Sequence, residues 1–180
     1  MKMQMQIINT DITTLQVDAI VNAANNSLMG GGGVDGAIHK AAGPELRAYC
    51  ATLRGCETGL AKITSAFNLP AKFIIHAVGP VWNNGTENEE SLLASCYENS
   101  LQLAVENNIK TIAFPCISTG AYRFPFDKAC MIALQTIDTF LAKNEVIEKV
   151  YLVVFVEKEF RNYERNLEKY YKNKNDEILN

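Results

Sequence analysis

The residues best suited to chemistry lie in one stretch, Asn22–Gly43, which reads NAANNSLMGGGGVDGAIHKAAG. It combines side-chain amides, four consecutive glycines, one carboxylate at Asp35 and the start of a helical pattern. A run of glycines costs backbone entropy, so it indicates either a close backbone approach or positive φ angles. A glycine loop that opens a helix presents bare N–H groups at the positive end of the helix dipole. This arrangement predicts a seat for a phosphate.

A dinucleotide-binding motif and a flexible surface loop are the alternative interpretations of the glycines. Gly31, Gly33 and Gly36 satisfy GxGxxG, but the dinucleotide fingerprint must follow a strand directly and needs an acid about 20 residues on. Here eight residues separate the glycines from the preceding predicted strand, and Cys50–Arg54 contains no acid. A Rossmann dehydrogenase is therefore disfavoured, and the chain has no P-loop motif. A flexible surface loop is the remaining structural alternative.

Composition indicates a globular protein that has no strongly basic face. The chain has 180 residues, of which 48% are hydrophobic and 21% charged, and its formal net charge is −3. This length suits one domain with a substantial core. The acidic balance makes the nucleic-acid backbone an unlikely partner. An acidic protein can still bind an anion through backbone N–H groups, which agrees with the glycine loop.

The five cysteines and two histidines are scattered, and no CxxC pair occurs. An odd number of cysteines without such pairs indicates free thiols in a reducing compartment, so we expect a cytoplasmic protein. The same scatter offers no metal-ligand set, and we expect neither a metal nor a cofactor. The N-terminus lacks a signal-peptide core and no stretch approaches membrane-spanning length, so we expect no membrane association.

The elements that must position these residues follow from apolar periodicity. The predicted strands are Met3–Ile8, Asp18–Val21, Lys62–Phe67, Phe73–Val78, Thr111–Pro115 and Val150–Val156. The predicted helices are Ala37–Ala42, one restarting at Pro44, Ser91–Glu106, Asp127–Lys143 and Glu157–Tyr171. Alternating strands and helices predict a three-layer α/β/α sandwich, and residues 1–180 show no linker that would divide one domain. We expect residues 172–180 to be a frayed tail.

Two loops of unusual composition follow predicted strands. NAAN and the glycines follow Asp18–Val21, and CISTGAY follows Thr111–Pro115. In open α/β sheets the ligand binds beyond the carboxyl ends of the strands. We therefore place the site between these two loops.

A series of motifs runs through nearly the whole chain. They are DIT (Asp11–Thr13), VDAIVNAAN (Val17–Asn25), GGGGVDGAIH (Gly30–His39), AAG (Ala41–Gly43), GCETGLAKIT (Gly55–Thr64), NLPAKFIIHAVGPVW (Asn68–Trp82), SCYENSL (Ser95–Leu101) and IAFPCISTGAY (Ile112–Tyr122). Together they resemble the macrodomain family, most closely its MacroD-type branch. The resemblance implies ADP-ribose binding on a three-layer α/β/α fold with a mixed, largely parallel central sheet.

The resemblance also implies a role for each matching residue. Asp11 would accept a hydrogen bond from the adenine 6-amino group, with Ile12 packing nearby, because a carboxylate only accepts. Asn25 would hold hydroxyl groups of the distal ribose, whereas Asn22 would hold loop backbone. Backbone N–H groups would wrap the pyrophosphate and distal ribose; they belong to Gly32, Gly33, Val34, Ser118, Thr119, Gly120, Ala121 and Tyr122.

Asp35 is the main catalytic candidate, with Asn25 beside it at the distal ribose. Asp35 would orient and polarise a water molecule next to the anomeric carbon or the ester carbonyl. An ordinary aspartate is a weak base, so its positioning should matter more than its basicity. The phosphate of the ligand would help to hold that water.

Simpler structural interpretations remain open for several of these residues. Asp11 could be a turn or helix cap, and Asp35 could be a first-turn acid favoured by the helix dipole. His39 and His76 are better explained as packing histidines than as bases, because no paired nucleophile motif accompanies them. Phe155 could cover the adenine face or pack in the core.

Some positions near the site depart from the family pattern or lack a partner. Arg123 stands where relatives commonly have a small residue, often glycine; it could meet the pyrophosphate, form a salt bridge across the cleft or point to solvent. Val156 replaces a commonly acidic residue, for which we have no functional interpretation. Cys116 borders the second loop without a histidine partner, and Tyr122 could act as a lid on the distal ribose.

The sequence therefore predicts a hydrolase that removes mono-ADP-ribose from acidic side chains of proteins and deacetylates O-acetyl-ADP-ribose. Its partners would be ADP-ribose and ADP-ribosylated proteins, and we expect a monomer. The alternative is a non-catalytic ADP-ribose reader. Asp35 together with Asn25 favours the enzyme, because a reader needs only the backbone cradle. A nucleic-acid-associated macrodomain is disfavoured by the acidic balance.

Overall fold

A computed structural model describes residues 4–178, in which strands and helices alternate. The elements, in chain order, are β1 (Met5–Asn9), the 3₁₀ turn η1 (Ile12–Thr14), β2 (Ala19–Ala24), α1 (Gly33–Ala42), α2 (Pro44–Leu53), β3 (Ala61–Ser65), β4 (Phe73–Val78), α3 (Glu89–Glu106), β5 (Thr111–Phe114), α4 (Phe126–Leu141), β6 (Lys149–Val154) and α5 (Glu157–Ile178). The strands and helices follow one another in the predicted order, with two consecutive helices at α1–α2 and two consecutive strands at β3–β4.

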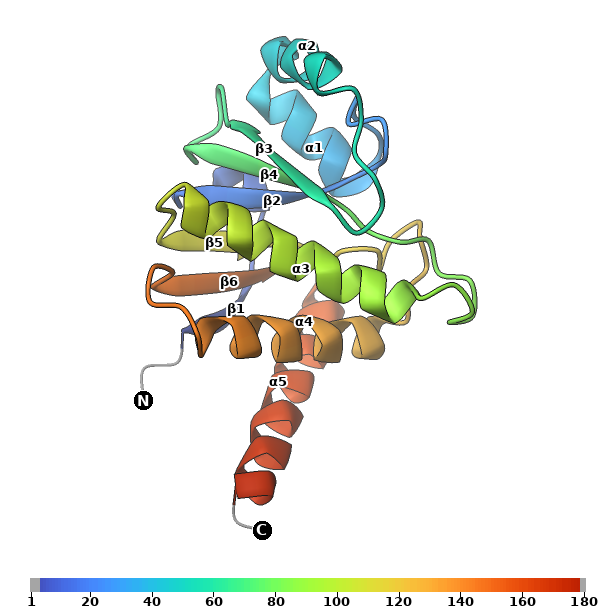
Figure 1. Cartoon of the computed structure of the whole chain (residues 1–180), viewed down its shortest axis with the longest axis vertical. Coiled ribbons are helices and arrows are strands. Elements are labelled where there is room, and N and C mark those ends of the chain that lie inside the picture. The colour runs from blue at the N-terminus through green and yellow to red at the C-terminus, as the bar shows by residue number, and fades with distance from the viewer. Residues whose placement is uncertain (1–3, 179–180) are drawn as a thin grey trace.

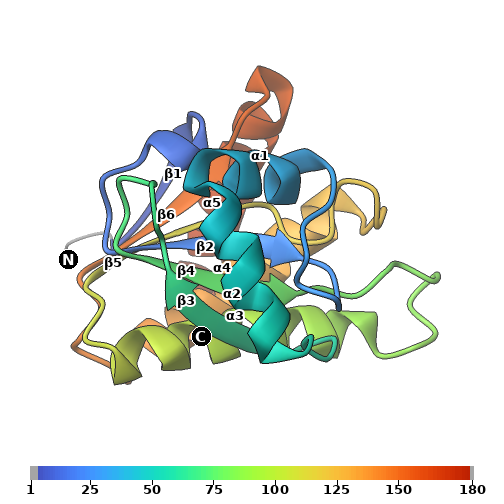
Figure 2. The same ribbon diagram turned by 90° about the horizontal axis from the view of Figure 1, so that it is seen from above.

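The strands form one mixed sheet in the order β1-β6-β5-β2-β4-β3 (Figure 1). All neighbouring pairs are parallel except β3 and β4, so β3 is an antiparallel edge strand. Seen from above, the sheet lies between α1 on one side and α3 on the other (Figure 2). This is the expected three-layer α/β/α sandwich. Because β1, β6, β5, β2 and β4 run the same way, their carboxyl ends meet at one edge.

Each face of the sheet has its own apolar core. One core lies between the sheet and α3, α4 and the start of α5; the other lies between the opposite face and α1 and α2. The apolar stripes of α3 and α4 are buried, as their periodic spacing requires of helices that cover a sheet. They consist of Leu93, Cys96, Tyr97, Leu101 and Ala104 on α3, and Cys130, Ala133, Leu134, Ile137 and Leu141 on α4.

Three element boundaries that matter for the site differ from prediction. β2 continues through Asn22 to Ala24, because the small residues after Val21 still pair with β4. α1 begins at Gly33 rather than Ala37, so Asp35 lies inside its first turn. α5 extends beyond Tyr171, where Lys174 forms an ion pair with Asp138 of α4.

The two ends of the described chain also differ from prediction. The strand predicted from Met3 begins at Met5, and Met3 lies outside the described residues. The frayed tail predicted for 172–180 is helical through Ile178, and residues 179–180 lie outside the described part. Among residues 4–178, no helix combines the length and apolarity needed to cross a membrane.

Candidate functional site

The predicted site residues gather at the carboxyl edge of the parallel strands. Asp11 and Ile12 follow β1, Asn25 and the glycine loop follow β2, the loop from Ser118 follows β5, and Phe155 follows β6. The β1 and β6 ends are tied together, since the N–H of Thr10 donates to the carbonyl of Val154 at 2.9 Å. Segments far apart in sequence are therefore brought to one edge, as an open α/β sheet requires of a ligand site.

The glycine loop is built by close approach at some positions and by backbone conformation at others. Gly30 and Gly33 have φ angles of +92° and +57°, which favour glycine. A Cβ on Gly36 would lie 2.5 Å from the carbonyl oxygen of Gly31, so Gly36 has to lack one. A Cβ on Gly32 would meet nothing within 4 Å. Gly32 therefore leaves bare backbone where α1 begins.

The N-terminus of α1 has no side-chain cap. Gly32 is the N-cap residue, and among residues 4–178 no side chain caps the first turn by a hydrogen bond. Helix geometry leaves the first N–H groups of α1 without helical partners. The positive end of the helix dipole adds to them, so this end of α1 can accept an anion.

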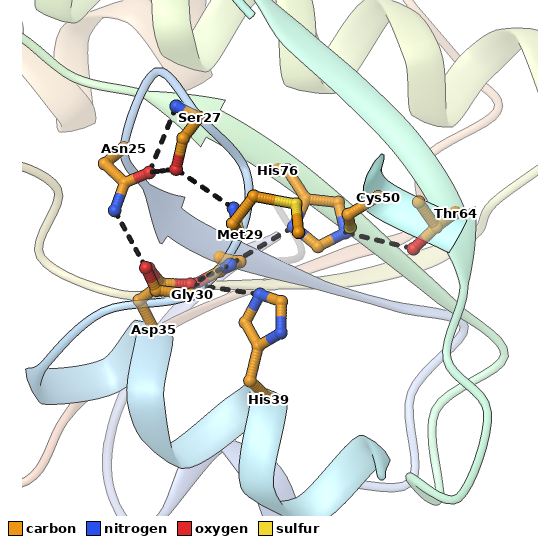
Figure 3. Close-up of polar contacts among 10 residues, drawn as sticks. Asn25, Ser27, Met29, Gly30, Asp35, His39, Cys50, Thr64 and His76 are labelled. Atoms are coloured by element: carbon orange, nitrogen blue, oxygen red, sulfur yellow. Dashed lines mark hydrogen bonds and ion pairs between the residues drawn. The ribbon is translucent and has the colours of Figure 1, made fainter. Parts of the chain in front are cut away.

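Asp35 is buried below this loop and is held by side chains from the sheet. Its side chain Oδ1 accepts a hydrogen bond of 2.8 Å from Nδ2 of Asn22. Nε2 of His39, one turn further along α1, lies 3.5 Å from the same oxygen (Figure 3). Oδ2 faces Gly31, where an added Cβ would lie 3.1 Å away. One carboxylate oxygen is thus anchored and the other faces the glycine loop.

The prediction that Asn22 holds the loop backbone is wrong, because Asn25 makes those contacts. Asn25 holds loop backbone: its Nδ2 donates to the carbonyl of Gly30 at 3.0 Å, and its Oδ1 accepts from the N–H and hydroxyl of Ser27 at 3.1 and 2.6 Å. Asn22, which we expected to hold that backbone, contacts Asp35 and His76 instead. The reason is the longer β2, which places Asn22 inside the strand on the face that α1 covers.

Asp11 does serve as a cap, which was the simpler interpretation. Its Oδ1 accepts from the N–H and hydroxyl of Thr13 at 2.9 and 2.7 Å, at the start of η1. Among the described residues, Oδ2 of Asp11 receives no hydrogen bond. Capping and adenine recognition are therefore compatible, because they use different oxygens. Ile12 behind it is buried.

The second loop packs closely against Gly79, which has no side chain to keep it away. A Cβ on Gly79, which follows β4, would lie 2.2 Å from Oγ of Ser118 and 2.6 Å from Cγ2 of Ile117. The side chain of Ser118 thus points inward, at a φ of +66°. The turn is closed by hydrogen bonds from Phe124 N–H to Ser118 and from Trp82 N–H to Tyr122, at 2.9 and 2.8 Å.

The exposed residues of this edge differ in their surroundings. Phe155 is 76% exposed, so it is not a core residue. It lies next to the β1 end that carries Asp11. Arg123 is exposed and has a φ of +58°. Gly120 and Ala121, between the two ends of the second loop, are also exposed.

Known proteins with similar sequences identify the family of this chain. A family model described as Macro domain matches residues 21–133. The chain belongs to the macrodomain family. An Escherichia fergusonii protein named O-acetyl-ADP-ribose deacetylase is 53% identical over 171 residues, covering 93% of this chain and 97% of its own. Human ADP-ribose glycohydrolase MACROD2 is 54% identical over 165 residues, covering 89% of this chain but only 38% of its own.

Solved macrodomain structures share the fold. The Oceanobacillus iheyensis macrodomain with ADP has a TM-score of 0.90 and 46% identity, covering 94% of this chain and 92% of that one. The Trypanosoma brucei macrodomain in complex with ADP-ribose has a TM-score of 0.86 and 41% identity, covering 91% and 69%. The family and the three-layer fold inferred from the sequence motifs are confirmed.

The cysteines of this macrodomain are free thiols. Burial raises the pKa of Cys116, which borders the second loop, to about 12, with a smaller contribution from the charge of Glu159. A thiol with that pKa is protonated at neutral pH and is a poor nucleophile. Among residues 4–178, no group of three or more His, Cys, Asp or Glu side chains is placed to hold a metal ion.

Sequence reasoning missed the polar residues that lie beneath the macrodomain site. His76 on β4 and Thr64 on β3 are buried and connect to Asn22 by hydrogen bonds. A signal was available, because Asn22 and His76 are polar residues within otherwise apolar strands. The sequence pattern does not show that both side chains face α1, or that their hydrogen bonds lead to Asp35. Those two features depend on strand register and on the position of the helix.

Proposed function

We propose that this macrodomain binds ADP-ribose between its two loops and hydrolyses bonds that attach acyl groups to it. The substrates would be proteins carrying mono-ADP-ribose on aspartate or glutamate, and O-acetyl-ADP-ribose. The proposal is supported by two relatives that are identical to this chain at more than half of the aligned residues. They are named O-acetyl-ADP-ribose deacetylase and ADP-ribose glycohydrolase.

The observation that carries the proposal is the setting of Asp35. The residue is only 5% exposed, yet its Oδ2 faces the bare backbone at Gly31. Nδ2 of Asn25 would lie 3.3 Å from a Cβ at the same glycine. A carboxylate and an amide therefore converge on a point at the surface of the loop. A module that only reads ADP-ribose has no need of a buried acid there.

Backbone N–H groups would make most of the contacts with the ligand. The uncapped first turn of α1, at Gly33 and Val34, would bind the pyrophosphate together with N–H groups from Thr119 to Tyr122. Oδ2 of Asp11 would accept from the adenine 6-amino group, and the exposed ring of Phe155 would cover the adenine. Such a grip suits a protein of net charge −3, because backbone N–H groups replace basic side chains.

Catalysis would depend on a water molecule oriented by Asp35. Oδ2 would accept a hydrogen bond from that water and point its lone pair at the reacting carbon, while Asn25 would hold the distal ribose. The ordinary basicity of a carboxylate is low, so the rate gain would come chiefly from orientation of the two reactants. His39 and the protonated thiol of Cys116 have no role as nucleophiles in this scheme.

The test is turnover by the purified protein of two substrates: O-acetyl-ADP-ribose and a protein ADP-ribosylated on glutamate. We expect hydrolysis of both. A protein that binds ADP-ribose by calorimetry but leaves both substrates intact would be the reader module instead. Absence of any ADP-ribose binding would refute both functions.

A second measurement identifies the bond that water attacks. Hydrolysis in ¹⁸O-labelled water places the label on the carboxylate product if the ester carbonyl is attacked. The label appears on ADP-ribose if the anomeric carbon is attacked. The two products are separated by mass spectrometry. This experiment distinguishes the two routes that a water held by Asp35 could take.

A further inference from the structure

A chain of buried polar side chains crosses three strands and ends at Asp35. Thr64 on β3, His76 on β4 and Asn22 on β2 are 4%, 0% and 0% exposed. Oγ1 of Thr64 lies 3.0 Å from Nε2 of His76 (Figure 3). Nδ1 of His76 lies 3.1 Å from Nδ2 of Asn22. Nδ2 of Asn22 then donates to Asp35 at 2.8 Å.

Strand register places these residues on one face. Asn22 pairs with His76 across β2 and β4, and Thr64 pairs with Ile74, two residues before His76. Side chains two residues apart on a strand share a face, so all three point toward α1 and α2. Apolar residues such as Ile20 and Ile74 fill the rest of this face. Burying polar groups there is costly unless their hydrogen bonds are made.

Electrostatics favours one direction for the hydrogen bonds of this chain. The amide nitrogen of Asn22 faces Asp35, because the amide oxygen would repel the carboxylate. Its two protons then go to Asp35 and to Nδ1 of His76, so Nδ1 accepts and carries no proton. The ring proton is then on Nε2, whose neighbours are Oγ1 of Thr64 at 3.0 Å and Sγ of Cys50 at 4.0 Å. The closer Oγ1 accepts it, and the Thr64 hydroxyl donates to the carbonyl of Ser65 at 2.9 Å.

Two features support a chain fixed in this single arrangement. Burial, with a smaller contribution from His39, lowers the pKa of His76 to about 3, so the ring is neutral at ordinary pH. The amide oxygen of Asn22 is buried and has no hydrogen-bond partner among the described residues. The Asn22 side chain is therefore oriented by its two amide protons, which go to Asp35 and His76, although its oxygen is left without a donor in the described part of the chain.

We propose that His76 and Thr64 are positioning residues, which lock the Asn22 amide so that it holds Oδ1 of Asp35 and turns Oδ2 toward the glycine loop. Packing alone does not require this, since an aliphatic residue at either position would fill the same space without a buried polar group. The inference rests on the proposed function, because positioning has a catalytic meaning only if Asp35 orients the attacking water.

The decisive comparison is Thr64→Val against Thr64→Ser. Valine has nearly the shape of threonine but cannot accept the Nε2 proton. Among the described residues, the variant leaves Nε2 only the weak acceptor Sγ of Cys50, 4.0 Å away, so His76 and Asn22 are freer to reorient. We expect kcat for O-acetyl-ADP-ribose to fall by about tenfold, since small displacements of a catalytic group cost rate steeply. The dissociation constant for ADP-ribose should stay within about twofold, because the ligand grip lies elsewhere. Thr64→Ser should restore kcat.

The matched control is Ser100→Ala, which removes a buried hydroxyl that donates to Cys96 at 2.6 Å on the opposite side of the sheet. It should lower the melting temperature without changing kcat. A loss of kcat in Thr64→Val that Ser100→Ala reproduces at equal loss of stability would show a general effect and overturn the proposal.

A measurement on the wild-type protein needs no variant. The ¹⁵N chemical shifts of the imidazole distinguish the two neutral tautomers, and we expect the proton of His76 on Nε2. A proton on Nδ1, or unchanged kcat in Thr64→Val, would refute positioning even if wild-type turnover is normal. Absence of wild-type turnover with intact ADP-ribose binding would instead refute the proposed function, and with it the catalytic meaning of this chain.

Discussion

Asn22 and Asp35 are 13 residues apart in the sequence, and a hydrogen bond of 2.8 Å joins them inside the protein. The bond connects β2 to the first turn of α1 across the glycine loop. The conformation of the glycine loop and the orientation of the Asp35 carboxylate therefore depend on each other.

Asp35→Ala should abolish hydrolysis while ADP-ribose still binds. We expect kcat to fall by about 100-fold or more, as for loss of a catalytic acid–base group, with the dissociation constant for ADP-ribose changed only a few-fold. Calorimetry and a turnover assay measure the two effects. Alanine leaves one proton of the Asn22 amide without its acceptor, so Asp35→Asn is the control, because its amide oxygen can accept the same hydrogen bond. Turnover in either variant at the wild-type rate would exclude Asp35 as the catalytic residue.

Asp11→Ala should weaken ADP-ribose binding by about 1.5–3 kcal/mol, the range for a hydrogen bond to a charged group. It also removes the cap of η1, so Asp11→Asn is the matched variant, since asparagine caps as well as aspartate. The cleanest comparison uses the hypoxanthine analogue of ADP-ribose, which lacks the 6-amino group. Wild type should bind the analogue more weakly than ADP-ribose, and Asp11→Ala should bind both equally. A wild-type protein indifferent to the 6-amino group would remove the adenine role.

Chelation should leave hydrolysis intact. The described residues offer no cluster of three metal-binding side chains, and the proposed grip on the pyrophosphate consists of backbone N–H groups. Turnover of O-acetyl-ADP-ribose is measured after dialysis against EDTA, with and without added Mg²⁺. Loss of activity that Mg²⁺ restores would show that a metal ion takes part in the reaction.

Apolar periodicity was sufficient to predict the strands and inward helix faces, because those depend on local spacing. It placed the start of α1 at Ala37, since glycines disfavour a helix by intrinsic propensity. The helix begins at Gly33 because tertiary contacts, including the Asn22–Asp35 bond, outweigh that preference. The end of α5 was missed for the same reason.

The motifs located the site residues but not their contacts. The pairing of Gly79 with Ser118 joins two loops nearly 40 positions apart, and no local pattern encodes that approach. The contact of Asn22 with Asp35, in place of the expected contact with loop backbone, depends on where β2 stops. Both features are set by strand register and by packing between elements, which a single sequence does not disclose.

Glu89→Gln should reduce stability in a pH-dependent way. The buried carboxylate accepts from the N–H groups of Asn83, Gly85 and Glu87 at 2.6, 3.2 and 2.7 Å. Burial alone would raise the pKa of Glu89, but these hydrogen bonds outweigh it and hold the pKa below its ordinary value of 4.5. The stabilisation is therefore fully present above that value and is lost as the pH falls through the lower folded-state pKa.

Melting temperatures at pH 7 and pH 3 measure this effect. We expect the gap between wild type and Glu89→Gln to be largest at pH 7 and to narrow at pH 3. Glu98→Gln, an exposed residue on the same helix, is the control and should give a small gap at both values. A gap for Glu89→Gln that is equal at the two pH values would contradict the linkage.

Arg123→Gly should stabilise the protein. Arg123 has a φ of +58°, a conformation that costs a side-chain-bearing residue about 1–2 kcal/mol. Among the described residues its side chain makes no hydrogen bond or ion pair that would compensate. Glycine adopts this conformation freely but loses about 0.5–1 kcal/mol of backbone entropy on folding. We expect a net gain of about 0.5–1 kcal/mol, or about 1–4 °C in Tm for a chain of this length.

The comparison for Arg123→Gly is Arg54→Gly, because Arg54 has the same φ of +58° at the end of α2, far along the chain from the second loop. Thermal unfolding should show gains of similar size for both. A gain at Arg54 alone would mean that the guanidinium of Arg123 stabilises the folded protein by an amount that offsets its backbone strain. Equal gains would show that the arginine at this position is tolerated at a cost to stability rather than retained for it.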